Sequence, residues 1–243
     1  MKYQVQINHE QLPVTIVQRR GQKNLRIRLK PHAVVVSGPA NLPKKELFSF
    51  VEAQMDWIKK RRGRQLERLK EMDRKKRENQ GKILIRGTYV RIIPDTSVWI
   101  RKPSLSFSEN KVWYTYNPDR EDHQKETPEP SLLSSFYQTL ATKELTEHVR
   151  KWSEITGLIP GRVSIRNQKT KWGSCSSKGT ISLNWRLILC PVEISDYIIV
   201  HELCHLKHFN HSPDFWKMVA EWYPELQHAK KWLRLHSEEI FSL

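Results

Sequence analysis

The chain has 243 residues, of which 38% are hydrophobic and nine are tryptophan, so it can bury one large core or two small ones. This composition excludes a chain that is disordered over most of its length. A formal net charge of +16 favours a polyanionic partner such as nucleic acid, although basic helices also carry such charge as a solvated surface.

No targeting or membrane-spanning segment is expected. The N-terminal stretch MKYQVQINHEQLPVTIV lacks the apolar centre of a signal peptide, and no run reaches the ~18–20 apolar residues of a membrane helix. The three cysteines, Cys175, Cys190 and Cys204, form no CxxC pair and indicate no disulfide framework. We therefore expect a cytoplasmic protein with reduced thiols and no membrane partner.

Alternating apolar and basic residues predict strands near the N-terminus. The segment NLRIRLK alternates in this way, and VTIVQRR before it and AVVVSGP after it are also strand-like. A small antiparallel sheet with one basic face is expected. In its middle segment the apolar side chains face one way and the basic side chains the other, namely Leu25, Ile27 and Leu29 against Arg26, Arg28 and Lys30.

A long helix is predicted next, over about residues 43–78. Asn41 can cap it, and Pro43 suits its first turn. Apolar residues recur at helical spacing as far as Ile58, but beyond Arg61 the sequence is mostly charged, which is typical of a solvated helical extension.

Further strands are predicted in GKILIRGTYVRIIP, SVWIRK and KVWYTYN, followed by the polar surface linker NPDREDHQKETPEP. The linker divides a β-rich domain over 1–125 from a second domain over 131–243. In the second domain we expect a helix that ends at Gly157, strands in RVSIRN and GTISLNWRLIL, and helices from Pro191 onward. The fold class is therefore α+β.

The sequence HELCH places His201, Glu202 and His205 in the HExxH pattern. Positions i and i+4 of a helix share one face, so both imidazoles can reach one metal ion at a Zn–N distance of about 2.0–2.1 Å. Glu202 lies beside the first ligand and can address a metal-bound water. The helix is expected over PVEISDYIIVHELCHLKHF, where two buried imidazoles without a partner would be costly.

A third ligand is predicted at His211, beyond Phe209-Asn210, where the helix can break. The spacing is that of HExxHxxGxxH sites, although His208 replaces the glycine. Three histidines suit Zn²⁺, which is the expected cofactor. Two carboxylates on the following helix are rival third ligands, Glu221 and Glu225.

A close resemblance to the YgjP-like metallopeptidase family is carried by TKWGSCSSKGTISLNWRLILCPVEISDYIIVHELCHLKHFNHSPDFW. The segments FVEAQMDWIKKR, RGTYVRI and WSEITGLIPGRVSIRNQ extend this likeness over most of the chain. The core also resembles SprT/Spartan and WLM metalloproteases, in which HExxH precedes a late histidine, here His211 before Asp214-Phe215. The resemblance implies a zincin-like core, and some of these relatives act on proteins crosslinked to DNA.

The expected function is a zinc metalloendopeptidase acting on proteins or peptides, with nucleic acid as a further partner through the basic surface. Glu202 is expected to take a proton from a zinc-activated water and to deliver it to the leaving amine. Asp214 can orient His211 or cap the next helix. The candidates for a second electrophile are Tyr197, Tyr223 and His228.

The alternative is a nucleic-acid-associated binding or regulatory protein in which zinc is structural. Phosphate contacts would then come from Arg26, Arg28 and Lys30 and from the run between Lys59 and Arg64. The segment GTISLNWRLIL is expected to form either a sheet edge that pairs with an extended peptide or an ordinary strand of the core.

Overall fold

The structure is a computed structural model that describes residues 4–7, 10–30, 32–119 and 127–243. Its contacts group the chain into two compact units, Met1–Glu78 and Asn79–Leu243. Helices and strands occur in both units, which confirms a mixed α+β protein. No helix in the described ranges has the length and apolar character needed to span a membrane.

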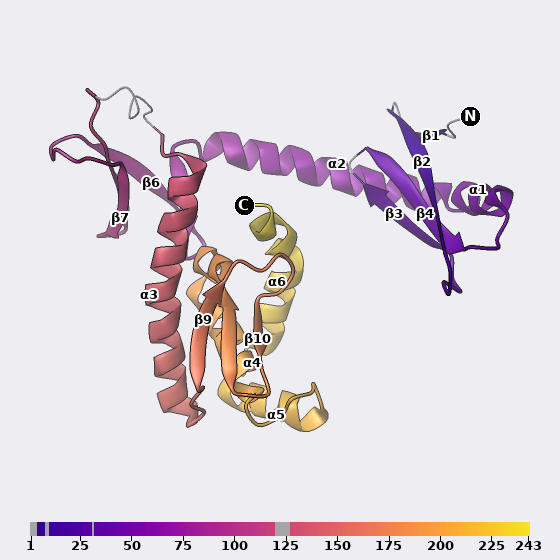
Figure 1. Cartoon of the computed structure of the whole chain (residues 1–243). Coiled ribbons are helices and arrows are strands. Elements are labelled where there is room, and N and C mark those ends of the chain that lie inside the picture. Colours follow the sequence, from indigo (N-terminus) through magenta and orange to yellow (C-terminus); the bar gives the residue numbers. More distant parts are fainter. Residues whose placement is uncertain (1–3, 8–9, 31, 120–126) are drawn as a thin grey trace. The chain divides into compact units, whose positions relative to one another are not determined.

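The first unit is a four-stranded sheet with two helices (Figure 1). The strand order is β1-β2-β4-β3, and β2 runs parallel to β4 while the other neighbours are antiparallel. The expectation of a purely antiparallel sheet is therefore wrong, because β4 pairs with β2 and leaves β3 at the edge. The strands are β1 (Gln4–Ile7), β2 (Glu10–Arg19), β3 (Arg26–Lys30) and β4 (Ala33–Pro39).

Two helices follow these strands, α1 (Lys44–Ala53) and α2 (Met55–Glu78), with a break at Gln54. Pro43 occupies the N-cap position without a side-chain cap, so the expected cap at Asn41 is wrong. The apolar side chains of the helices and of one sheet face form a buried core, which includes Val34, Val36, Leu47, Val51 and Ile58.

The second unit begins with another four-stranded sheet, of order β5-β6-β8-β7. The strand expected over 97–102 is absent from the described chain, because Asp95 Oδ1 accepts hydrogen bonds from Ser97 N and Oγ and turns the backbone. Trp99 is 77% exposed there and has no core to pack against. The strands are β5 (Lys82–Ile85), β6 (Thr88–Asp95), β7 (Ser104–Ser108) and β8 (Lys111–Thr115).

These four strands belong to the same compact unit as the C-terminal helices, whereas the sequence groups them with the N-terminal strands. Part of the predicted surface linker, residues 120–126, lies outside the described residues. The domain boundary between 125 and 131 stays a prediction of the sequence.

The rest of the second unit surrounds a three-stranded sheet of order β10-β11-β9, with α3 beside β9 and α4 beside β10 (Figure 1). The helix α3 ends where Gly157 adopts a left-handed φ of 69°, as expected. The remaining elements are α3 (Pro130–Thr156), β9 (Arg162–Arg166), β10 (Gly173–Cys175), β11 (Thr180–Asn184), the 3₁₀ helix η2 (Trp185–Leu189), α4 (Val192–Cys204), α5 (Pro213–Trp222) and α6 (Leu226–Phe241).

The strand expected over GTISLNWRLIL ends early, at Asn184, because that side chain accepts a hydrogen bond from Arg186 N at 3.1 Å and caps η2. β11 is also the central strand of its sheet, so of the two alternatives the core strand is confirmed and the sheet edge is wrong. The edges are β9 and β10, and β10 is a strand of three residues that the sequence pattern does not predict.

Candidate metal centre

The helix α4 carries the HExxH residues through the centre of the second unit. Side chains on nearly all its sides are buried, including Ile199, Val200 and Leu203, as expected for a helix that is apolar all round. The sequence predicts a helix as far as Phe209, but α4 ends at Cys204 and His205 is its C-cap. After this end the amides of Lys207 and His208 donate to Cys204 O at 3.1 Å and turn the chain.

This turn brings the three predicted histidines together. One ring nitrogen from each of His201, His205 and His211 lies within 4.8 Å of the others. His211 Nε2 is 3.1 Å from His201 Nε2. Two nitrogens bound to one tetrahedral zinc would be about 3.3 Å apart, given a Zn–N distance of ~2.0–2.1 Å. The spacing of His201 and His211 therefore fits a shared metal ion.

The electrostatics of the cluster also suit a metal. Burial lowers the pKa of His201 to about 3, and burial likewise lowers the pKa of His205. Both rings are therefore neutral near pH 7, as metal ligands must be. His205 Nδ1 lies 2.8 Å from His208 O, a contact in which the protonated nitrogen donates and leaves Nε2 free to coordinate.

Two aromatic residues of α5 hold the imidazoles in place. Phe215 is fully buried, and its ring centroid lies 4.4 Å from that of His205 and 4.9 Å from those of His201 and His211. Trp216 stacks on His211 at 5.4 Å. The hydroxyl of Ser212 accepts from Phe215 N at 3.3 Å and starts α5 directly after His211. The local sequence HSPDFW thus supplies the third histidine of the cluster and its packing surface.

Glu202 is buried beside this cluster, and its Oε2 has no hydrogen-bond partner among the described residues. Burial raises the pKa of its carboxyl to about 7, although the positive charge of Lys171 opposes that effect. The carboxylate lies against β10, because a Cβ added at Gly173 would be 2.6 Å from Glu202 Oε1. A carboxyl with this pKa can both accept and release a proton near neutral pH.

Asn184 secures the loop that leads to β10. Its side-chain amide donates to Gln168 O at 2.7 Å and to Lys171 O at 2.9 Å, and the residue is fully buried. Asn184 is not among the site residues predicted from the sequence. An asparagine inside the apolar run ISLNWRLIL was the available signal, because a buried amide must find partners.

The rival ligands lie elsewhere. Glu221 and Glu225 are exposed and do not belong to the histidine cluster, and neither does Cys175. Asp214 is exposed in the first turn of α5, where Ser212 acts as the cap. Among the described residues no hydrogen bond joins Asp214 to His211.

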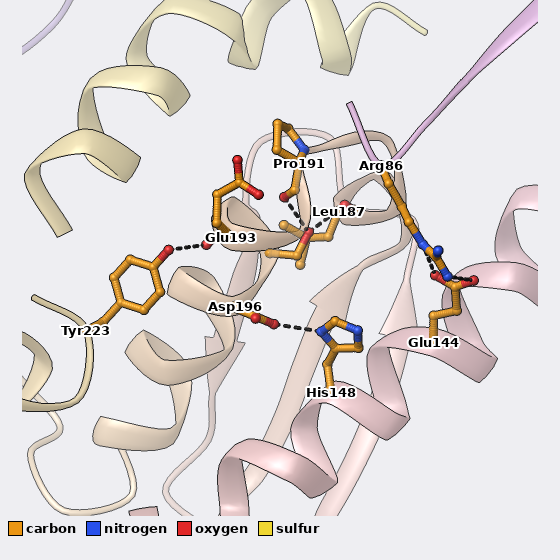
Figure 2. A network of polar contacts seen from close by, with 9 residues as sticks. Arg86, Glu144, His148, Leu187, Pro191, Glu193, Asp196 and Tyr223 are labelled. Atoms are coloured by element: carbon orange, nitrogen blue, oxygen red, sulfur yellow. Dashed lines mark hydrogen bonds and ion pairs between the residues drawn. The ribbon is translucent and has the colours of Figure 1, made fainter. Parts of the chain in front are cut away.

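The three candidates for a second electrophile differ in their surroundings. Tyr223 donates its hydroxyl to Glu193 O at 2.6 Å (Figure 2), and His228 is exposed. Tyr197 is buried, with its ring centroid 6.0 Å from that of His201. A cation that the sequence does not mark also lies nearby: Lys230 Nζ is 3.3 Å from the centroid of Trp216, and its charge contributes to lowering the pKa of His201.

Polar contacts hold the first half of α4 against neighbouring elements (Figure 2). His148 of α3 bonds through Nδ1 to Asp196 Oδ1 at 2.6 Å, five residues before the first histidine of the cluster. The hydroxyl of Ser195 donates to Leu187 O at 2.7 Å. These bonds set the position of the helix that carries two members of the cluster.

The chain is similar to known metallopeptidases. Residues 23–236 match the protein family described as YgjP-like, metallopeptidase domain. No curated protein matches the chain. Among solved structures, the crystal structure of the metallopeptidase zymogen of Pyrococcus abyssi abylysin matches with 29% identity and a TM-score of 0.35, over 39% of this chain and 93% of that chain.

Proposed function

We propose that this chain, which belongs to the YgjP-like metallopeptidase family, is a zinc-dependent endopeptidase with a zincin-like active site. Its ligands would be His201, His205 and His211, and its general base Glu202. The observation that carries the proposal is the convergence of three imidazoles within 4.8 Å on and after the HExxH helix, beside a buried carboxyl.

In this proposal the residues have separate tasks. The three neutral imidazoles would hold Zn²⁺, which would supply a water of lowered pKa and polarise the scissile carbonyl. Glu202 takes the proton from the attacking water and passes it to the leaving amine, which its raised pKa favours. Phe215 excludes water from one side of the imidazoles and keeps their rings in place.

The edge strand β10 is the proposed docking position of the substrate. It pairs with β11 on one side only, so a peptide in extended conformation can add to its other side through backbone hydrogen bonds. Gly173 of this strand touches the Glu202 carboxylate, which places the peptide backbone close to the general base. Backbone pairing depends little on the substrate's side chains, so we expect the enzyme to tolerate many substrate sequences. Because the chain is strongly basic, we also expect proteins associated with nucleic acid among its substrates.

A purely structural zinc site in a binding protein is less consistent with the burial of the Glu202 carboxyl. A buried carboxyl without a hydrogen-bond partner destabilises the fold and contributes nothing to a structural site. In an endopeptidase the same group performs the proton transfer.

The proposal is tested with metal-loaded wild type and two variants acting on a panel of unfolded proteins, followed by mass spectrometry of the products. Glu202→Gln should retain its zinc in elemental analysis and lose about 10²- to 10⁴-fold in cleavage rate, because general-base catalysis contributes that much. His211→Ala should lose the metal. Glu221→Gln, which changes an exposed acid on α5, is the control and should behave as wild type.

Cleavage by Glu202→Gln at the wild-type rate would exclude Glu202 as the base. Full zinc retention by His211→Ala would exclude His211 as a ligand. An inactive wild type with one zinc bound would favour the structural alternative.

A further inference from the structure

The excess positive charge of the chain is concentrated in its first unit. Residues 1–78 contain 20 of the 42 lysines and arginines but only eight of the 26 aspartates and glutamates. Strands β1 to β4 span residues 4–39, in which Glu10 is the one acid. That carboxylate is engaged by Arg62, a residue of α2 that is 3% exposed, through bonds of 2.8–3.1 Å.

The two faces of this sheet differ. One face packs against α1 and α2 through side chains such as Val34 and Val36. The opposite face carries a groove of about 290 Å³. Four cations and two half-buried valines provide most of its lining, namely Arg19, Arg26, Arg28, Lys30, Val17 and Val35.

The strand register arranges these groups in rows across the groove. Arg26 lies opposite Ser37, which in turn lies opposite Val17; Arg28 lies opposite Val35. Along β3 the cations occupy every second position, so they recur at about 6.7 Å. Among the described residues, none of the four cations has a side-chain hydrogen bond or ion pair, and all four are exposed.

We propose that this groove binds the phosphate backbone of single-stranded nucleic acid. A row of unpaired cations along an extended strand matches the regular charges of an extended polyanion, and the two valines offer an apolar floor for sugars. Residues 4–39 contain no Phe, Tyr or Trp on which bases could stack, so binding is independent of base sequence and steeply dependent on salt.

The site is distinct from the histidine cluster, which belongs to the other unit. The basic residues between Lys59 and Arg64 lie on α2 and form a separate set of charges. One of them, Arg62, forms an ion pair with Glu10. The groove and the helix can therefore be tested independently.

Fluorescence anisotropy of the full chain with labelled oligothymidylate and oligouridylate, at several salt concentrations, tests the proposal. With four phosphate contacts the slope of log affinity against log salt should be about −3, since each contact contributes ~0.7 for a single strand. The triple substitution Arg26→Gln, Arg28→Gln, Lys30→Gln should reduce affinity at least tenfold and the slope by about 2.

The matched control is Lys59→Gln, Lys60→Gln, Arg64→Gln, which removes the same charge from exposed positions of α2 and should retain affinity within about threefold. Equal losses of affinity in both triple variants, or no binding by wild type, would overturn the proposal that the groove binds nucleic acid. So would stronger binding to phosphatidylserine vesicles or to polyglutamate than to the oligonucleotides. Circular dichroism checks the fold of each variant, and cleavage of an unfolded protein without nucleic acid should be unchanged in both.

Discussion

At the scale of single residues, the candidate metal centre depends on polar atoms that are costly to bury. Glu202 Oε2 and His201 Nδ1 have no hydrogen-bond partner in the described part of the chain. Such groups destabilise the folded state unless a ligand or a reaction makes use of them. The buried carboxyl of Glu202, which directly follows the first histidine of the cluster, is therefore the strongest local sign of function.

Gly173 provides a residue-scale prediction. In Gly173→Ala the new methyl carbon would lie 2.6 Å from Glu202 Oε1 and 2.7 Å from Glu202 Cγ, so the buried carboxyl must move. We expect peptidase activity to fall at least tenfold with zinc content unchanged, because small displacements of a catalytic group are costly. Measurements of kcat/KM and of bound metal check this. In the control Gly161→Ala the nearest atom is 3.7 Å away, and an equal loss in both variants would contradict the role of Gly173.

At the scale of elements, α4 is held by its contacts with α3 and η2 as much as by its own helical pattern (Figure 2). The hydrogen bond with Asp196 raises the pKa of His148 above its ordinary value, while partial burial opposes the shift. Protonated His148 therefore stabilises the folded state. This contribution is fully present below the unfolded-state pKa of about 6.5 and is lost as the pH rises through the raised folded-state value.

The resulting prediction concerns stability against pH. His148→Gln should lower the free energy of unfolding by on the order of 1 to 2 kcal/mol at about pH 6, and by clearly less at about pH 9. Urea denaturation at the two pH values measures the difference. Arg150→Gln is the control on the same helix, because its exposed ion pairs with Glu147 and Glu154 contribute little. A loss of equal size at both pH values would contradict the assignment.

At the scale of the whole molecule, two compact units each contain a hydrophobic core of their own. The histidine cluster and all the side chains that support it belong to Asn79–Leu243, whereas the basic groove belongs to Met1–Glu78. Catalysis and nucleic-acid binding would then be assigned to different units of one chain.

Removing the metal tests this division. Calorimetry of the full chain should show a transition that zinc shifts upward by about 5–10 °C when free zinc exceeds its dissociation constant ~100-fold. The transition of the first unit should not move, because its core contains no ligand. His211→Ala should abolish the shift, and a zinc-induced shift of both transitions would contradict the assignment of the metal to the second unit alone.

Features that depend on neighbouring residues were predictable from the sequence. The period of two along β3 and the helical pattern ending at Gly157 needed only local spacing, and so did the shared face of His201 and His205. These patterns report which side of an element is apolar or reactive, and that property is set within a few residues.

Features that depend on distant partners required the tertiary structure. The parallel pairing of β2 with β4 joins strands that are separated in the chain by β3. The packing of Phe215 under three imidazoles and the contact of Gly173 with Glu202 likewise join different elements. Local periodicity determined that two histidines share a helix face. Only packing in the folded chain decided which third histidine, which carboxyl and which strand meet them, because the burial of a side chain depends on the other elements around it.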